Sequence, residues 1–360
     1  MIGSSPLRLT LDGHALVANW RWLAKMSGTA ACGAAIKADG YGVGARAVLD
    51  RLAAAGCRDF FVTTWDEVRA LGAPPEGVSF SVLHGVREED MAEALASRAR
   101  PTLNTREQVG RWKEARGGPC DVMIDTGMNR LGLAAQDVTD GLLDGLAIDT
   151  LMSHLASADE DVPQNERQRA AFAALAGRTS ARRMSLANSA GICLGPDYHF
   201  DLTRPGLALY GGIPRREAVG HIAQVAYLEA QMIQRRRIAA GESVGYNATF
   251  TAGRPMELAI LNIGYADGYL RGFSNRGSAG GERFPVIGRI SMDLLAVCVD
   301  AAPGLREGDW VVLDYDLPTA SAQSGLAQYE LLTMLGSRFE RIWAQKMGRP
   351  EGRPEGFEIC

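Results

Sequence analysis

The sequence predicts an α/β fold, a TIM-like (β/α)8 barrel followed by a mostly β C-terminal domain. A short apolar run, a polar or glycine-marked end and a helical stretch recur eight times between about residues 29 and 210. Polar side chains stand where these runs stop, as expected at the mouth of a parallel barrel. After about residue 225 the rhythm changes to β-branched or alternating segments separated by Gly, Pro or Asp.

The eight apolar runs are the predicted barrel strands. They end near Lys37, Thr63, His84, Asn104, Asp125, His154, Asn188 and Leu207–Tyr210. Between them, apolar residues at three- and four-residue spacing predict helices over 45–55, 65–71, 88–97, 106–115 and 165–175. A doubly wound sheet is the rival that counting alone leaves open. The polar strand ends favour the barrel, where they converge on one mouth.

Strands in the second half are expected over 225–237, 257–263, 284–290, 294–299 and 310–314, with one clear helix over 327–335. The predicted domains are therefore a barrel over 10–224 and a β domain over 225–360, to which an N-terminal strand over 1–9 can be added. Residues 352–356 are expected to form a frayed tail.

Composition excludes several classes of protein. The 360 residues are 46% hydrophobic and 22% charged, so a large core can form. The net charge of −4 and the absence of a basic run give no sign of nucleic acid or membrane-surface binding. No apolar stretch approaches the roughly 18 residues of a membrane span, and no signal peptide opens the chain. The six cysteines are scattered without a CxxC pair, which predicts a reduced, cytoplasmic protein without a metal site.

The densest local signal is the segment Ala34–Ala45, where an apolar strand ends in Lys37 and a glycine-rich turn opens a helix. The plainest interpretation is a surface lysine beside an ordinary βα turn. A second is a dinucleotide fingerprint over Gly40–Ala45 with Asp66 as the acidic residue. That match is short, and a lysine and an aspartate precede its first glycine. A third is an amine that is partly desolvated in a barrel mouth and attacks an aldehyde.

Several separated blocks bear on this choice, and they occur in a fixed order along the chain. The blocks are Ile36–Gly42, Ile124–Gly132, Ser153–Glu160, Ala187–Ala190, Arg204–Gly211, Val244–Tyr246, Gly264–Tyr269 and Gly288–Asp293. On these blocks the chain resembles the alanine racemases, pyridoxal-phosphate enzymes, from about Leu11 to Trp343.

The resemblance implies a pyridoxal 5'-phosphate enzyme that interconverts L- and D-alanine and supplies D-alanine for peptidoglycan. Racemisation needs two acid–base groups on opposite faces of the substrate. The resemblance assigns one face to Lys37, which also anchors the cofactor, and the other face to Tyr246 from the neighbouring subunit. Activity would then require a homodimer.

It also implies a cofactor site. Tyr41, Asn188, Ser189 and the backbone at Gly206 and Leu207 would hold the phosphate side. Arg204 would face the ring nitrogen, keep it unprotonated and weaken the electron sink. His154 would stack on the ring.

The implied substrate groups are Arg130, Met292 and Asp293, with the carboxylate held by Arg130 and the backbone at Met292. Entrance residues would be Tyr265, Arg271 and Asp159. Two positions depart from the family pattern. Met123 stands where some relatives carry a carbamylated lysine, and Ser337 where some have a tyrosine.

Four other functions were weighed against this one. They are a racemase of broader specificity, including serine, a fold-related pyridoxal-phosphate amino-acid decarboxylase, a cofactor-carrying barrel in vitamin handling, and a nicotinamide dehydrogenase. The roughly 135 residues after 225 argue against the vitamin-handling barrel, which lacks a second domain. Tyr246 and Ser291–Asp293 stand where the decarboxylases use a cysteine from the second subunit.

Overall fold

We analysed a computed structural model that describes residues 5–344. The expected tail over 352–356 and the first residues of the expected strand over 1–9 lie outside this range. The described residues form two compact units, one of residues 16–223 and one that joins residues 5–15 to residues 224–344. Within residues 5–344, no helix has the length and apolar character needed to cross a membrane.

The unit of residues 16–223 contains a parallel sheet of seven strands in sequential order. The strands are β3 (Ala34–Ala35), β4 (Asp59–Val62), β5 (Ser79–Val82), β6 (Arg100–Leu103), β7 (Cys120–Met123), β8 (Ile148–Met152) and β9 (Arg183–Ser185). Each strand pairs in parallel with the next. The four residues of β4 are all buried, as expected for a strand covered on both faces.

Hydrogen bonds on either side of an eighth strand close this sheet into a barrel. Strand β10 (Leu202–Thr203) pairs in parallel with β2 (Ala31–Cys32). On that side the Ala35 N–H donates to Pro205 O at 2.8 Å. On the other side the Arg204 N–H donates to Ala187 O at 2.8 Å, just beyond β9. The predicted (β/α)8 barrel is confirmed.

One predicted strand is wrong. The eighth apolar run, Leu207–Tyr210, is the 3-10 helix η2, and the strand lies before it at β10. Every residue of η2 is buried, so its continuous apolar pattern resembles that of a barrel strand. The Tyr210 hydroxyl donates to Ala35 O at 2.8 Å, which fixes η2 against the barrel wall.

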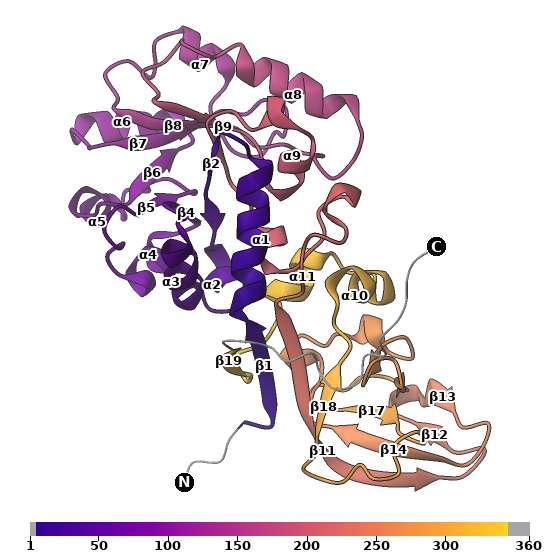
Figure 1. Cartoon of the computed structure of the whole chain (residues 1–360). Coiled ribbons are helices and arrows are strands. Elements are labelled where there is room, and N and C mark those ends of the chain that lie inside the picture. The colour runs from indigo at the N-terminus through magenta and orange to yellow at the C-terminus, as the bar shows by residue number, and fades with distance from the viewer. Residues whose placement is uncertain (1–4, 345–360) are drawn as a thin grey trace. The chain divides into compact units, whose positions relative to one another are not determined.

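Helices lie around the outside of the strands (Figure 1). They are α1 (Gly13–Met26), α3 (Ala45–Ala55), α4 (Trp65–Leu71), α5 (Met91–Ala96), α6 (Arg106–Glu114), α7 (Ala135–Thr139), α8 (Pro163–Ala173) and α9 (Ser189–Cys193). The short segment α2 (Lys37–Tyr41) is instead a turn with left-handed backbone over residues 38–41. Expected helices 45–55 and 65–71 match α3 and α4, whereas α5 is shorter than the expected 88–97. Threonine caps start α4 and α6, where the Thr64 and Thr105 side chains accept from the N–H three residues on.

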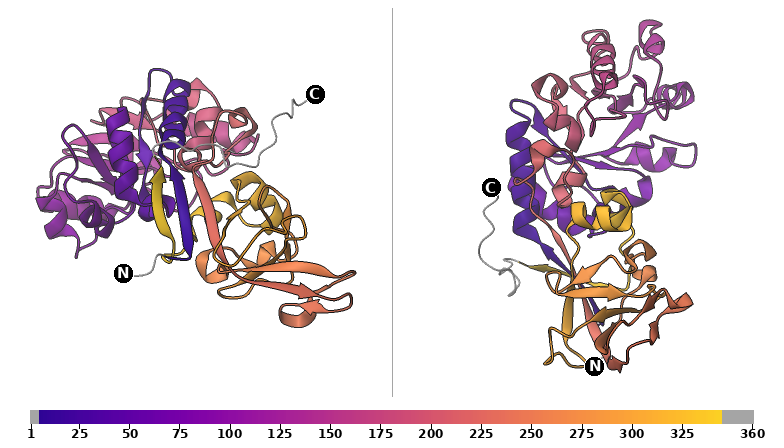
Figure 2. Two further views of the ribbon diagram at one scale, coloured as in Figure 1. Left: turned by 60° about the horizontal axis from the view of Figure 1, so that its bottom comes forward. Right: turned by 90° about the vertical axis from the view of Figure 1, so that its right-hand side faces the viewer.

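The other unit is a mostly antiparallel sheet of eight strands. Its strands are β1 (Leu7–Asp12), β11 (Ala226–Ile238), β14 (Met256–Leu261), β15 (Ser278–Ala279), β16 (Phe284–Ile287), β17 (Leu295–Cys298), β18 (Trp310–Leu313) and β19 (Glu340–Ala344). β1 lies between β11 and β19, with β19 parallel to it (Figure 2). A small hairpin of β12 (Ser243–Val244) and β13 (Phe250–Thr251) extends beyond β11.

Two helices belong to this unit, although the sequence predicted one. The expected helix over 327–335 is α11 (Gln328–Thr333). The additional helix is α10 (Leu317–Ser324), which has weak helix formers and little amphipathic pattern. Asp316 caps α10 by accepting from the Thr319 N–H at 3.3 Å, and Pro318 occupies its first turn.

Candidate active site

Lys37 stands two residues after the end of β3, at the carboxyl end of the barrel strands. Its side chain is half-buried. Burial lowers the pKa of its amine, and so do the charges of Arg130 and Arg204, while Glu67 opposes them. A larger neutral fraction at a given pH makes this amine a better nucleophile and base.

Arg204 follows β10 and is buried, with a residue exposure of 7%. Its guanidinium donates to the Ser185 hydroxyl and, at 2.5 Å, to Ser153 O. Burial lowers its pKa to about 10, and Asp121 opposes the shift. Arg204 therefore keeps its charge at neutral pH although no carboxylate is bonded to it among the described residues.

His154 follows β8 and lies among the same cations. Burial lowers its pKa to about 3, with further lowering by Arg204, Arg130 and Lys37. The imidazole is therefore neutral in the folded protein at pH 7. Gln168 of α8 fixes the backbone here, because its Nε2 donates to His154 O at 2.9 Å.

A cradle of hydroxyl and N–H groups lies beside these cations, between α9 and η2. The Ser189 hydroxyl accepts from the Gly206 N–H at 2.9 Å and from the Ala208 N–H at 3.2 Å. A Cβ on Gly206 would lie 2.1 Å from the Tyr41 hydroxyl, so only glycine lets Tyr41 approach this closely. The Tyr41 ring is stacked on Tyr210 with ring centroids 4.7 Å apart. The Asn188 side chain caps α9 by accepting from the Gly191 N–H.

The loop that carries Arg130 is held by Asp125, a residue to which the sequence assigned no role. The Asp125 carboxylate accepts from the Gly127 N–H at 2.8 Å and the Met128 N–H at 2.9 Å. The pKa of the Asp125 carboxyl is lowered overall. Burial acts to raise it, but the hydrogen bonds from these and the following N–H groups up to Arg130 outweigh burial. Met123 is a buried residue at the end of β7, 8% exposed, and does not substitute for a charged partner of Arg130.

Other polar strand ends serve the scaffold. The Asn104 amide donates to Leu83 O at 3.0 Å and Thr102 O at 2.6 Å. His84 lies 3.4 Å from the Asp90 carboxylate. Asp66 of the dinucleotide hypothesis is an exposed residue of α4 that pairs with Arg69.

The remaining predicted residues belong mainly to the other unit. Tyr246 opens the 3-10 turn η4 (Tyr246–Ala248) in the β12–β13 hairpin and is 63% exposed. Asn247 and Ala248 in this turn have φ values of 62° and 48°. Asp159 is an exposed residue of the barrel unit.

Tyr265 and Met292 lie against each other through their backbones. The Tyr265 N–H donates to Ser291 O at 3.1 Å, and a Cβ on Gly264 would lie 2.3 Å from Met292 O. The Arg271 guanidinium lies 4.9 Å from the centre of the Tyr265 ring.

Arg338, which the sequence did not single out, links this region to Asp293. It donates to the Asp267 carboxylate at 2.6 and 2.8 Å and to the Asp293 carboxylate at 2.7 Å. Ser337 beside it is exposed.

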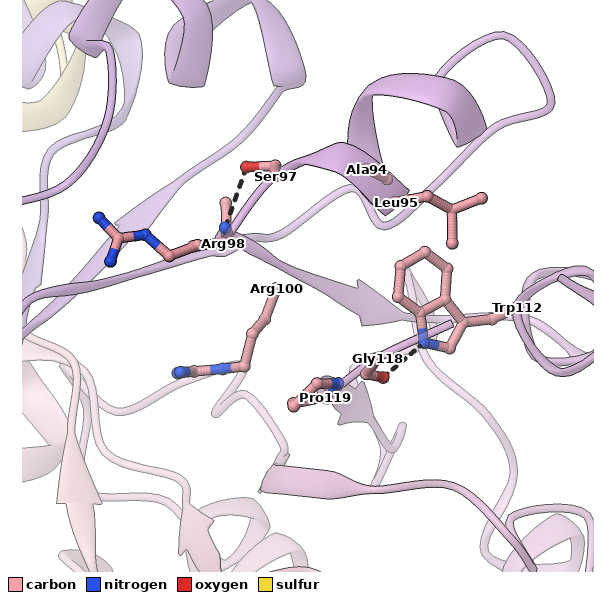
Figure 3. A pocket seen from close by; sticks show the side chains of 9 residues that line it. Ala94, Leu95, Ser97, Arg98, Arg100, Trp112, Gly118 and Pro119 are labelled. Carbon is pink, nitrogen blue, oxygen red and sulfur yellow. Dashed lines mark hydrogen bonds between the residues drawn. The ribbon is translucent and has the colours of Figure 1, made fainter. Parts of the chain in front are cut away.

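A cavity of about 330 Å³ lies at the opposite end of the barrel, before the starts of β6 and β7 (Figure 3). Its lining includes Leu95, Arg98, Arg100, Trp112 and Pro119. The Trp112 indole N–H donates to Gly118 O at 3.0 Å. None of the lysine, histidine or hydroxyl groups of the mouth lines this cavity.

The mouth suits an anionic aldehyde cofactor such as the pyridoxal phosphate expected from the sequence. Lys37 supplies an amine of lowered pKa. The charges of Arg130 and Arg204 act on this amine, and the carboxylate of Glu67 opposes them. Such an excess of positive charge favours a ligand that carries phosphate and carboxylate groups. The cradle at Ser189 and Gly206 offers hydroxyl and N–H groups of the kind that binds phosphate.

A (β/α)8 barrel with a lysine of lowered pKa at its mouth, followed by a β domain, defines a class of two-domain barrel proteins. The profile of the alanine racemase N-terminal domain matches residues 11–214, and that of the C-terminal domain matches residues 225–343. The chain belongs to the alanine racemase family and is an isomerase.

Relatives and a solved structure are similar to this chain along nearly its whole length. An alanine racemase of Acidiphilium cryptum is 42% identical, covering 93% of this chain and 98% of its own. A catabolic alanine racemase of Mesorhizobium japonicum is 39% identical, covering 92% of each. The crystal structure of the Bartonella henselae alanine racemase with covalently bound pyridoxal phosphate is 35% identical, with a TM-score of 0.87, covering 95% of this chain and 100% of its own.

Proposed function

We propose that this enzyme interconverts L- and D-alanine in the cytoplasm by proton transfer at the alanine Cα, with Lys37 on one face and the partner subunit's Tyr246 on the other. Its cofactor is pyridoxal phosphate, as in the Bartonella henselae relative, and the group supplies an electron sink for the pair left at Cα. The observation that carries the proposal is the Lys37 amine of lowered pKa within a cluster of three other cationic or basic groups, Arg130, His154 and Arg204.

Lys37 is suited to two tasks, attachment of the cofactor and removal or return of a proton. Both need an amine that is neutral part of the time near neutral pH. Burial and the two arginines lower its pKa in that direction.

Arg204 would face the cofactor ring nitrogen and keep it unprotonated. Its pKa of about 10 leaves it charged at pH 7, so it donates hydrogen bonds and keeps its proton. This weakens the electron sink and favours simple proton exchange over transamination. The neutral His154 would stack on the ring.

The cradle would hold the phosphate through Tyr41, Ser189, Asn188 and the backbone at Gly206 and Leu207. Arg130 and the backbone at Met292, beside Asp293, would hold the substrate carboxylate. Tyr265, Arg271 and Asp159 would line the entrance and select a small amino acid.

The high exposure of Tyr246 supports its role across a subunit boundary. A tyrosine that is 63% exposed on a turn with positive φ values is placed to enter another chain rather than its own core. We therefore propose an obligate homodimer with shared active sites.

Racemisation of L- and D-alanine by the wild type and by Lys37→Ala, followed by chiral chromatography, tests the proposal. We expect a loss of about 10³-fold or more, because base and attachment point are lost together. Borohydride reduction followed by peptide mapping should place the cofactor on Lys37 in the wild type. A label elsewhere, or a Lys37→Ala variant with near-normal activity, would contradict it.

Tyr246→Phe tests the second base and the shared site. Proton exchange from one enantiomer should survive far better than exchange from the other. Mixing Lys37→Ala with Tyr246→Phe should restore activity, since in a mixed dimer one site then holds both intact groups. Random exchange gives about a quarter of wild-type activity. Absence of recovery, despite proven subunit exchange, would place both groups in one chain.

We also propose that the D-alanine enters peptidoglycan. A strain lacking the gene should grow only when D-alanine is supplied. Growth without D-alanine would favour a catabolic role, as the name of the Mesorhizobium japonicum relative indicates for that protein.

A further inference from the structure

The backbone after Lys37 is unusual. Ala38, Asp39, Gly40 and Tyr41 have φ values of 52°, 52°, 64° and 56°. Four consecutive residues therefore form one turn of left-handed helix. For a residue with a Cβ this conformation is strained, because the Cβ lies too close to the following carbonyl oxygen. Because three of the four residues carry a Cβ, the turn needs support from the structure around it.

Glu67 of α4 supplies that support from another part of the chain. Its carboxylate accepts from the Ala38 N–H at 2.6 Å and, with the other oxygen, from the Thr63 N–H at 2.5 Å. The Glu67 N–H in turn donates to the Thr64 hydroxyl, which completes a capping box. One side chain thus joins the first turn of α4, the end of β4 and the turn that follows the lysine.

Two glutamines make the equivalent contacts at other strand ends. The Gln108 Oε1 accepts from the Asn104 N–H at 2.8 Å, and its Nε2 donates to His84 O at 3.1 Å. The Gln168 Oε1 accepts from the Ala156 N–H at 2.9 Å. In both cases an amide fits because one partner is a donor and the other an acceptor.

At Glu67 both partners are N–H donors. An amide has one acceptor oxygen, so a glutamine here would direct its NH2 group at one of the two N–H groups. A carboxylate is the side chain that satisfies both. The sequence motif Thr64–Glu67 predicts a capping box and does not reveal the second contact.

We propose that Glu67 is a positioning residue for Lys37, whose carboxylate holds the left-handed turn that orients the Lys37 amine and the Tyr41 hydroxyl. The inference rests on the proposed function of Lys37. The hydrogen bond reaches the residue adjacent to the lysine, so its loss would displace the amine rather than the barrel.

Charge gives Glu67 a second effect on the same amine. Arg130 and Arg204 act on Lys37 from the loops after β7 and β10, and His154 lies among these cations after β8. Glu67 acts on Lys37 from α4. Its negative charge raises the Lys37 pKa, whereas burial and the two arginines lower it. Its removal would therefore leave Lys37 with a still lower pKa.

The test compares Glu67→Ala, Glu67→Gln and the matched control Gln108→Ala in the holoenzyme. For Glu67→Ala we expect kcat to fall about 10- to 100-fold, as a displaced reacting group predicts, with KM for alanine within about twofold. The circular dichroism of the bound cofactor should weaken, and amide exchange over residues 36–45 should accelerate. Glu67→Gln should lie between Glu67→Ala and wild type. Gln108→Ala should keep kcat within about twofold and accelerate exchange near residues 84 and 104.

Three results would overturn the proposal. The first is a kcat for Glu67→Ala no lower than that of Gln108→Ala. The second is wild-type kcat and cofactor circular dichroism in Glu67→Gln, which also decides the matter if Glu67→Ala does not fold. The third is unchanged exchange over residues 36–45 in both Glu67 variants. Borohydride labelling of Lys37 in the wild type separates the two hypotheses. If Lys37 is not labelled, the proposed function itself is refuted. If Lys37 is labelled but the Glu67 variants keep wild-type kcat and cofactor circular dichroism, only the inference about Glu67 is refuted.

Discussion

Arginines at the two ends of the barrel strands have different kinds of hydrogen-bond partner. At the amino ends, the Arg183 guanidinium donates to the Asp59 carboxylate at 2.8 and 3.1 Å and to the Asp149 carboxylate at 2.7 Å. Arg100 similarly bridges Asp121 and Asp149, both at 3.2 Å. At the carboxyl ends, Arg204 is more deeply buried than Arg183 or Arg100. Among residues 5–344, its guanidinium has only a hydroxyl and a carbonyl as hydrogen-bond partners.

The difference separates structure from function within one barrel. The pKa of Asp149 is lowered overall. Burial acts to raise it, but Arg100 and Arg183 outweigh burial, as expected of ion pairs that stabilise the charged forms. At the mouth, burial and the charges of Arg130 and Arg204 lower the pKa values of Lys37 and His154. Paired charges hold the amino end together, and unpaired charges at the mouth are available to ligands.

The largest effect on stability should come from breaking the paired end. We expect Arg183→Met to lower the free energy of unfolding by about 3 kcal/mol or more, since two carboxylates lose a partner. Arg204→Met should change it by less than about 1 kcal/mol, because a buried charge is removed with its hydrogen bonds, while racemase activity falls at least about tenfold. Urea denaturation at pH 7 measures the stability of both variants, and a racemisation assay measures the activity of Arg204→Met. An equal loss of stability would mean that Arg204 is a structural cation.

A smaller effect is expected from filling the cradle. Gly206→Ala places a methyl group 2.1 Å from the original position of the Tyr41 hydroxyl, so Tyr41 must move. Cofactor affinity should fall about tenfold, about 1.4 kcal/mol. Gly118→Ala at the amino end is the matched control, because a Cβ there meets no atom within 4 Å. Equilibrium dialysis compares the two variants, and similar affinities would remove the cradle from the cofactor site.

A further effect, on the pH dependence of stability, appears only when the pH is changed. The pKa of His154 falls from 6.5 to about 3 on folding, so between these values the unfolded chain binds the additional proton and stability decreases as pH falls. Asp149, with a lowered pKa, contributes stability that is lost only below its ordinary value of 3.8.

His154→Gln should therefore flatten the stability curve between pH 6.5 and 4. Asp149→Asn should lower stability throughout, because its ion pairs are lost, and should alter the slope of the curve only below about pH 3.8. Urea midpoints measured across this range check the two windows. An unchanged curve in His154→Gln would show that the histidine protonates freely at the mouth.

Much of the fold could be predicted because local periodicity and tertiary burial agree. The helix over 45–55 was predicted with the bounds of α3, since its apolar face repeats at helical spacing. Where the pattern is weak or shared, the prediction failed. α10 contains Pro, Thr and Ser and depends on its Asp316 cap, and the buried η2 has the same apolar composition as a strand.

The site shows a similar division. The motif around Lys37 predicted the amine, and the blocks around Arg204 and Ser189 predicted its neighbours; their roles stay predictions. Asp125 and Glu67 were not identified as site residues, because they act on backbone N–H groups that any residue carries. Contacts of that kind leave no pattern in side-chain types.

The sequence by itself determined the barrel and the family, because apolar periodicity and motif residues are local properties of the chain. Tertiary structure alone decided which charges are paired, which glycine admits a hydroxyl, and which carboxylate supports the left-handed turn after Lys37. These depend on distances of a few ångströms between segments far apart in the sequence, and only folding sets such distances.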